Sequence, residues 1–188
     1  MRLLIYGSKE FAATVAELIQ HCGHEVIGMV DDFSTSPGIV GTFDSVTRDF
    51  PACDYGFAVA IGYSNIPARW KAWERIRTAG YRAPALVHPR AYVAGSAIVG
   101  EGAMIMAGAI VDVRARLGEL TVVWPGACIN HDAIVGDNSF VSPNATVCGS
   151  AVIGRDSFLG AASAIADHVV VPPNSFIKMN SSYKVNRQ

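Results

Sequence analysis

The sequence is poor in charged residues and has no long apolar run. Only 16% of its 188 residues are charged and the formal net charge is -1, so no basic surface suited to nucleic acid is expected. No apolar stretch reaches the roughly 18 residues of a membrane span, and the apolar run at 3–6 is too short for a signal peptide. We therefore expect an unprocessed, cytoplasmic protein without membrane insertion.

The four cysteines form no Cys-x-x-Cys pair, which argues against a zinc site and against a disulfide framework. The five histidines are scattered and share no face, so a metal-binding cluster is not expected either. Both absences together predict a reduced protein without a bound metal.

The first 84 residues alternate short apolar runs with helical patterns. Apolar runs predict strands at 2–7, 24–30 and 55–62, and the helical period predicts helices at 9–22 and 66–80. Strands that alternate with helices pair in parallel through right-handed crossovers. We expect a small α/β domain with a Rossmann-like parallel sheet over 1–84.

After Pro84 a six-residue period replaces the helical one. Sixteen aliphatic residues follow one another at this spacing from Val87 to Ile177, and the residue two positions before each is almost always small. This pattern is typical of a parallel β-helix built from hexapeptides, in which three hexads form one coil of 18 residues. We expect about five coils in a second domain over 85–188, with residues 18 apart stacked in one column.

His131 lies two positions after the inward-facing Ile129, in a column of mixed polar and turn-forming residues that must face outward. Gly149 follows His131 by one coil and occupies the same column. From the spacing alone, a surface histidine beside a turn glycine is the simpler interpretation of this pair.

Five segments carry a resemblance to a known family: LLIYG at 3–7, VIGMVDDF at 26–33, AVAIG at 58–62, VHPRAYV at 87–93 and, above all, INHDAIVGDNSFVSPNATVCGSAVIG at 129–154. The chain resembles the bacterial sugar acyltransferases in which a nucleotide-sugar domain precedes a left-handed β-helix. These include the N-acetyltransferases of bacillosamine and perosamine biosynthesis and the sialic acid O-acetyltransferases. The resemblance implies acetyl-CoA as co-substrate, a nucleotide-linked amino sugar as acceptor, and a homotrimer with sites between neighbouring subunits.

The resemblance also implies roles for individual residues. It makes His131 the general base, and Asp132 the acid that orients the imidazole and raises its basicity. Side chains of neighbouring residues on an extended strand point to opposite faces, so a direct His131–Asp132 pair requires a corner at this place. The Gly149 N–H becomes a candidate oxyanion donor. The positions matching the CoA channel of the family are Phe140, Ala161 and Met179. The alternatives are a solvated turn carboxylate at Asp132, a simple turn at Gly149, and surface packing for the channel residues.

A nucleotide site is expected at the ends of the first three predicted strands, formed by Gly7, Ser8, Lys9, Asp31, Asp32 and Gly62. In such domains the first loop holds phosphates at a helix N-terminus, and an acid about 20 residues later holds a ribose. The loop at 7–12 departs from the family because it has one glycine and places Glu10 beside Lys9. Ser8 is expected to cap the helix. Turn formation by the two aspartates and a simple strand end at Gly62 are the alternatives.

Two departures concern the acceptor pocket. Trp124 stands where bacillosamine-type enzymes carry a small polar residue, and Phe140 stands where they carry a second histidine. The favoured hypothesis is an acetyl-CoA-dependent N-acetyltransferase. A sugar O-acetyltransferase of the sialic acid type and a non-catalytic trimeric binding scaffold are its alternatives.

Overall fold

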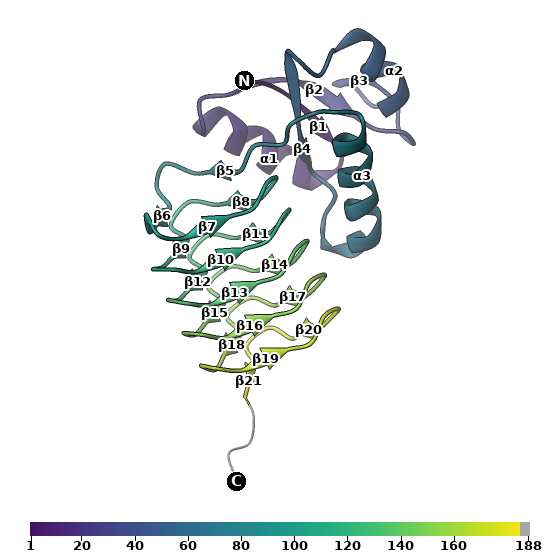
Figure 1. Ribbon diagram of the computed structural model, residues 1–188. Coiled ribbons are helices and arrows are strands. Elements are labelled where there is room, and N and C mark those ends of the chain that lie inside the picture. Colours follow the sequence, from purple (N-terminus) through teal and green to yellow (C-terminus); the bar gives the residue numbers. More distant parts are fainter. Residues whose placement is uncertain (185–188) are drawn as a thin grey trace. The chain divides into compact units, whose positions relative to one another are not determined.

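The structure is a computed structural model that describes residues 1–184. The chain divides into two compact units, one of Met1–Leu86 and one that begins at Val87 (Figure 1). The division expected from the sequence, 1–84 and 85–188, places the boundary two residues earlier, and its residues 185–188 lie outside the described part of the chain.

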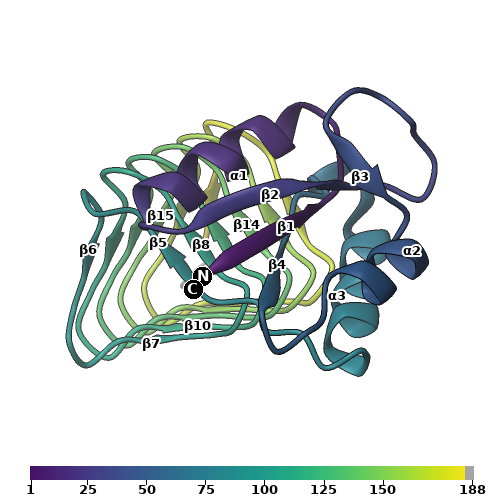
Figure 2. The same ribbon diagram turned by 90° about the horizontal axis from the view of Figure 1, so that it is seen from above.

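The N-terminal unit is a four-stranded parallel sheet of order β3-β2-β1-β4. Its strands are β1 (Arg2–Tyr6), β2 (Glu25–Val30), β3 (Ile39–Gly41) and β4 (Tyr55–Val59). Helix α1 (Glu10–His21) lies on one face, while α2 (Phe43–Asp49) and α3 (Ile66–Thr78) lie on the other, with the short 3-10 helix η1 (Tyr63–Asn65) before α3 (Figure 2). Buried apolar side chains of β1 and β4 form the centre of this unit.

The sequence pattern identified three of these strands and both long helices, but it missed β3 and α2. Strand β3 has three residues and α2 has seven, which is too short for either period to be recognised. Thr42 begins α2, and its side chain accepts a hydrogen bond from the Ser45 N–H.

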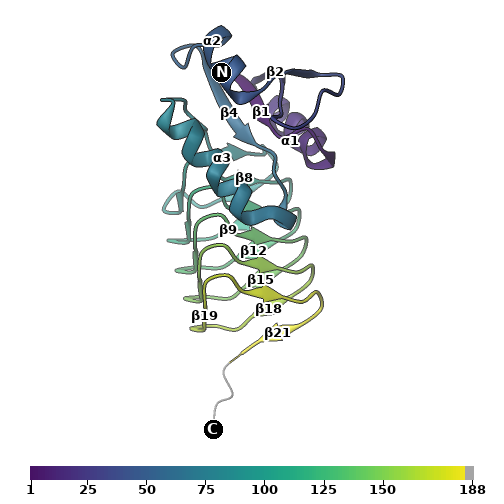
Figure 3. The same ribbon diagram turned by 90° about the vertical axis from the view of Figure 1, so that its right-hand side faces the viewer.

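The second unit is a left-handed parallel β-helix, as expected. Three parallel sheets, named here after their first strand, are built from two-residue strands joined by four-residue turns (Figures 1 and 3). The β5 sheet contains β5 (Leu86–Val87), β8 (Met104–Ile105), β11 (Val122–Val123), β14 (Phe140–Val141), β17 (Phe158–Leu159) and β20 (Phe176–Ile177). The β6 sheet contains β6 (Tyr92–Val93), β9 (Ile110–Val111), β12 (Cys128–Ile129), β15 (Thr146–Val147), β18 (Ala164–Ile165) and β21 (Ser182–Tyr183). The β7 sheet contains β7 (Ile98–Val99), β10 (Arg116–Leu117), β13 (Ile134–Val135), β16 (Val152–Ile153) and β19 (Val170–Val171).

The register between coils is 18 residues, so that Ile129 pairs with Val147 and Val135 pairs with Ile153. The predicted aliphatic column and half of the small residues two positions before it form the core of the β-helix or pack against it. The second residue of each turn from Gly102 to Asn180 has a φ between 53° and 72°. Gly, Asn and Asp fill most of these places, because they adopt this left-handed conformation at the lowest cost.

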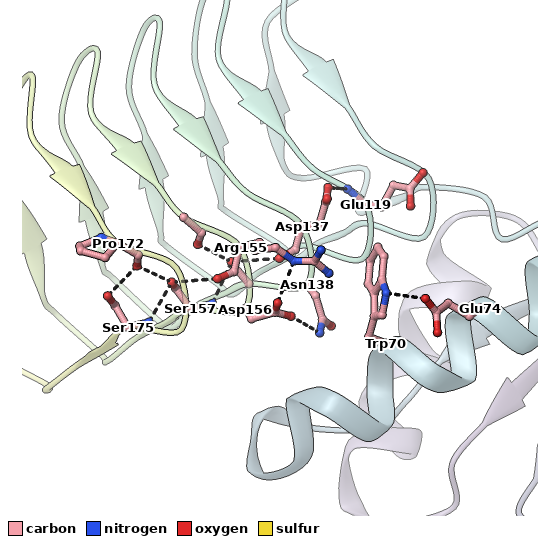
Figure 4. Close-up of polar contacts among 12 residues, drawn as sticks. Trp70, Glu74, Glu119, Asp137, Asn138, Arg155, Asp156, Ser157, Pro172 and Ser175 are labelled. Atoms are coloured by element: carbon pink, nitrogen blue, oxygen red, sulfur yellow. Dashed lines mark hydrogen bonds and ion pairs between the residues drawn. The ribbon is translucent and has the colours of Figure 1, made fainter.

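Side chains link successive coils at the corner between the β7 and β5 sheets (Figure 4). The Ser157 N–H donates to Ser139 Oγ at 3.1 Å, and the Ser175 N–H donates to Ser157 Oγ at 3.2 Å. Beside them, Asn138 Nδ2 donates to Asp156 Oδ1 at 2.8 Å. The two serine contacts satisfy backbone donors that the tight corner leaves without a carbonyl partner, and the Asn138–Asp156 contact joins side chains of successive coils.

Candidate active site

His131 and Asp132 lie in the turn between β12 and β13, at the corner where the β6 and β7 sheets meet. Asp132 has a φ of 60°, which breaks the alternation of an extended strand. The two adjacent side chains therefore meet, with His131 Nδ1 at 2.9 Å from Asp132 Oδ2. The His131 side chain is 58% exposed, so its ring is accessible from solvent.

Arg114 occupies the same turn position as Asp132 one coil earlier and holds the carboxylate with two hydrogen bonds. Its Nε donates to Oδ1 at 2.7 Å and its Nη2 donates to Oδ2 at 2.8 Å. Arg114 first, and then His131, hold the pKa of Asp132 well below its ordinary value, so the carboxylate is ionised at neutral pH. The sequence pattern did not single out Arg114, although the 18-residue register places it directly beneath Asp132.

Gly149 lies one coil after His131 and leaves the space that the imidazole occupies. A Cβ at this position would lie 2.7 Å from both Cε1 and Nε2 of His131, and 3.3 Å from Nδ1. Gly149 is not in the left-handed region, so space rather than backbone conformation requires a glycine here. Within residues 1–184 no acceptor pairs with the Gly149 N–H, whereas its carbonyl accepts from the His168 N–H at 3.1 Å. Gly149, whose N–H has no acceptor within residues 1–184, thus lies beside an accessible imidazole.

The residues matched to a CoA channel do not gather around His131 within one chain. Ala161 and Met179 are one coil apart at a different corner, where the β5 sheet meets the β6 sheet. Met179 is 66% exposed, whereas Phe140, on β14 of the β5 sheet, is only 1% exposed. The base and the channel residues thus lie on different edges of the triangular β-helix.

In the N-terminal unit, Ser8 and Asp31 bind each other. Ser8 Oγ donates to Asp31 Oδ2 at 2.5 Å, and the Phe33 N–H donates to the other carboxylate oxygen at 2.8 Å. Ser8 does not cap α1, contrary to expectation; the cap position is Lys9, whose side chain makes no capping bond. The Ser8 hydroxyl is directed to the carboxylate, which is the stronger acceptor.

The two glycines of the predicted nucleotide site have different surroundings. At Gly7, with a φ of 118°, a Cβ would lie 2.8 Å from the carbonyl oxygen of Ala60. At Gly62, just before η1, a Cβ would meet nothing within 4 Å. Gly7 therefore permits the close approach of two strand ends, while the space beside Gly62 is open.

Asp32 is the centre of a polar cluster that links β1, α2 and α3. It accepts hydrogen bonds from the Tyr6 hydroxyl at 2.5 Å, Arg75 Nη1 at 2.6 Å and the Phe43 N–H at 2.8 Å. Burial alone would raise the pKa of Asp32, but these hydrogen bonds outweigh it and the pKa is lowered. Arg75 also donates to Asp44 at 2.9 Å and lies over the Phe43 ring at 4.4 Å. Asp32 thus has a structural set of partners in this unit.

The comparisons with known proteins agree with this architecture. Residues 2–76 match the family model of the PglD N-terminal domain. The acetyltransferase domain of PglB from Neisseria gonorrhoeae, solved with acetyl coenzyme A, is 26% identical over 95% of this chain and 88% of its own, with a TM-score of 0.85. A histidine-to-asparagine variant of perosamine N-acetyltransferase from Caulobacter crescentus, solved with CoA and GDP-perosamine, is 25% identical over 95% and 93%, with a TM-score of 0.77. The chain is thus similar to known sugar acetyltransferases over nearly its full length, and residues 2–76 match the PglD N-terminal domain.

The expected resemblance of the chain to the bacterial sugar acyltransferases is thereby confirmed. The fold extends to WeeI from Acinetobacter baumannii, which is 16% identical over 91% of this chain and 94% of its own, with a TM-score of 0.67. No curated protein sequence matches the chain. Among its described residues, no group of three potential ligands could hold a metal ion, and no helix has the length and apolar character needed to cross a membrane.

Proposed function

We propose that the protein is an acyltransferase that transfers an acetyl group from acetyl-CoA to the amino group of a nucleotide-linked amino sugar, with His131 as general base. The observation that carries this proposal is the arrangement of His131, Asp132 and Gly149 at one corner of the β-helix, with ring and glycine in contact. The bound acetyl coenzyme A and GDP-perosamine of the similar structures support the choice of substrates.

The reaction forms a C–N bond and breaks the C–S bond of the thioester, and CoA leaves as the thiol. The attacking amine gains a positive charge that must be lost as a proton, and Nε2 of a neutral imidazole accepts it before passing it to the leaving sulfur. Asp132 holds the proton on Nδ1 through the 2.9 Å contact, which leaves Nε2 free as the acceptor. General base catalysis of this kind contributes about 10²- to 10⁴-fold in rate.

The Gly149 N–H is proposed as the donor to the oxyanion that develops on the thioester carbonyl. Its lack of an acceptor within residues 1–184 and its place beside the imidazole both fit this role. One such donor typically lowers the barrier by about 3 kcal/mol.

A homotrimer would supply the rest of the CoA site. His131 and Gly149 lie on one edge of the β-helix, whereas Ala161 and Met179 lie on another, so one chain cannot line a single channel with all four. We propose that the edge of one subunit that carries His131 faces the edge of a neighbour that carries Met179. Phe140, buried on its sheet, would then support the channel rather than contact CoA directly.

Transfer to a hydroxyl group, as in sialic acid O-acetylation, is a second candidate, and the N-terminal unit favours it. Ser8 pairs with Asp31, and Asp32 is held by Tyr6 and Arg75. Fewer side chains are therefore available to bind a nucleotide than the favoured hypothesis requires. Nucleotide binding at Gly7, Lys9 and Gly62 would then depend mainly on backbone groups and on the Lys9 ammonium.

Free-thiol release from acetyl-CoA tests both candidates. Wild type and His131→Asn are assayed with UDP-, dTDP- and GDP-linked 4-amino sugars and with free sialic acid, beside His21→Asn as a control at an exposed position of α1. We expect turnover with one amino sugar, a loss of at least about 10²-fold in His131→Asn, and unchanged acetyl-CoA affinity. A fully active His131→Asn protein would refute the role of the base. Resistance of the product to mild alkali distinguishes an amide from an ester.

A further inference from the structure

The contact between Arg114 and Asp132 has the geometry of a positioning device. The guanidinium binds both carboxylate oxygens, and Oδ2 also contacts His131 Nδ1, so a single oxygen joins the arginine to the imidazole. A bidentate pair of this kind determines the plane of the carboxylate as well as its position. The direction of the His131 ring therefore depends on a side chain one coil away.

The backbone holds both ends of this contact in place. The Arg114 N–H donates to Ser96 Oγ at 3.1 Å, and the Asp132 N–H donates to the Val113 carbonyl at 3.0 Å. Both Arg114 and Asp132 are in the left-handed conformation, with φ of 57° and 60°. Successive turns of the corner thus hold one another, and the arginine reaches the carboxylate from a defined backbone position.

Fold stability does not explain this ion pair. The Arg114 side chain is 64% exposed, and ion pairs exposed to this degree contribute little to folding because water screens them. A role in orienting the site accounts for the paired geometry better than a role in stability.

The charge of Arg114 has a second consequence. The guanidinium offsets the negative charge of Asp132 that the imidazole would otherwise face alone. Among the described residues, other titratable or charged side chains near this corner include Cys128 on β12, Asp112 and Arg116 on the preceding coil, Cys148 on the following coil, and Asp167 and His168 one coil further. The Asp132 carboxylate itself is held by Arg114 and His131, so these two side chains dominate its charge balance.

We propose that Arg114 is a positioning residue for acetyl transfer, which acts through Asp132 to keep His131 in the Nδ1–H tautomer with Nε2 unprotonated; this inference rests on the proposed function. Arg114→Gln removes both the paired hydrogen bonds to the carboxylate and the positive charge. Arg114→Lys keeps the charge but cannot bind both oxygens in the same way. Arg116→Gln is the matched control, because it removes the same charge from an exposed residue on the adjoining strand.

The first readout is the tautomer of His131, measured by nitrogen NMR on the unliganded protein. We expect the Nδ1–H form in wild type and in Arg116→Gln, and a mixture of tautomers in Arg114→Gln. An unchanged tautomer in Arg114→Gln would overturn the proposal. This measurement needs no acceptor sugar, so it decides the role of Arg114 even if wild type turned over none of the sugars tested and the proposed function failed.

The second readout is the dependence of the rate on pH. In Arg114→Gln we expect kcat to fall about tenfold, with both KM values within about twofold of wild type. The acidic limb of its pH–rate profile should move to higher pH, because Asp132 without its arginine partner attracts a positive charge on the imidazole more strongly. Arg114→Lys should keep the acidic limb of the pH–rate profile at its wild-type position and have a kcat between those of Arg114→Gln and wild type. Equal losses in Arg114→Lys and Arg114→Gln, with no movement of the limb, would indicate a purely structural role and overturn the proposal.

Discussion

Replacement of Gly149 by alanine should displace the proposed base and leave the fold intact. The added Cβ would lie 2.7 Å from Cε1 and Nε2 of His131, whereas ordinary contacts begin at 3.4 Å, so the ring must move by at least about 0.7 Å. A misplacement near 1 Å can reduce a rate about 10²-fold, equivalent to about 2.7 kcal/mol of barrier. We expect a loss of this size in kcat.

Gly95→Ala is the matched control for this prediction. Gly95 lies in the same column, two coils before His131, and a Cβ there would meet nothing within 4 Å. Neither glycine is in the left-handed region, so alanine strains neither backbone. Both variants should melt within a few degrees of wild type, because alanine at such sites changes stability by less than about 1 kcal/mol.

Thiol release from acetyl-CoA, measured beside thermal melting, distinguishes the two variants. The expected result is a large loss of kcat in Gly149→Ala only, with the wild-type melting temperature retained. A kcat equal to that of wild type in Gly149→Ala would refute the reasoning, because the position of the His131 imidazole would then not depend on the space that this glycine leaves. Equal losses of activity in Gly95→Ala and Gly149→Ala would refute it as well.

Two further predictions concern stability. Ser157→Ala leaves the Ser175 N–H without its acceptor and should lower the free energy of unfolding by about 1–3 kcal/mol. The buried hydroxyl of Ser163 has no hydrogen-bond partner among the described residues, so Ser163→Ala should change the free energy of unfolding by less than about 0.5 kcal/mol. Urea unfolding compares the two, and equal costs would contradict the argument. Asp32→Asn should cost about 2 kcal/mol by weakening the contact with Arg75. Because the pKa of Asp32 is lower in the folded state, its carboxylate stabilises the fold fully at pH values above its ordinary pKa near 4. This stabilisation is lost as the pH falls through the folded-state pKa. Acid should therefore lower the melting temperature more in wild type than in Asp32→Asn. Identical acid profiles would contradict this.

Much of the β-helix was predictable because its rule is local. Each hexapeptide repeats one inward aliphatic residue, one small residue and one left-handed turn position, and these choices determine the direction of every side chain. The same register places Gly149 over His131 from the 18-residue spacing alone. The short elements β3 and α2 escaped prediction because three and seven residues contain too little of any period.

The sequence by itself determined the coil length, the outward column of His131 and the parallel pairing of the first strands, since each follows from a period repeated along the chain. Only the tertiary structure decided that the turn at Asp132 brings the carboxylate to His131, that Arg114 holds it from the coil below, and that Arg75 holds Asp32 across 43 residues. The physical reason is that hydrogen bonds between side chains depend on backbone angles and on distant neighbours. A periodic pattern contains neither of these.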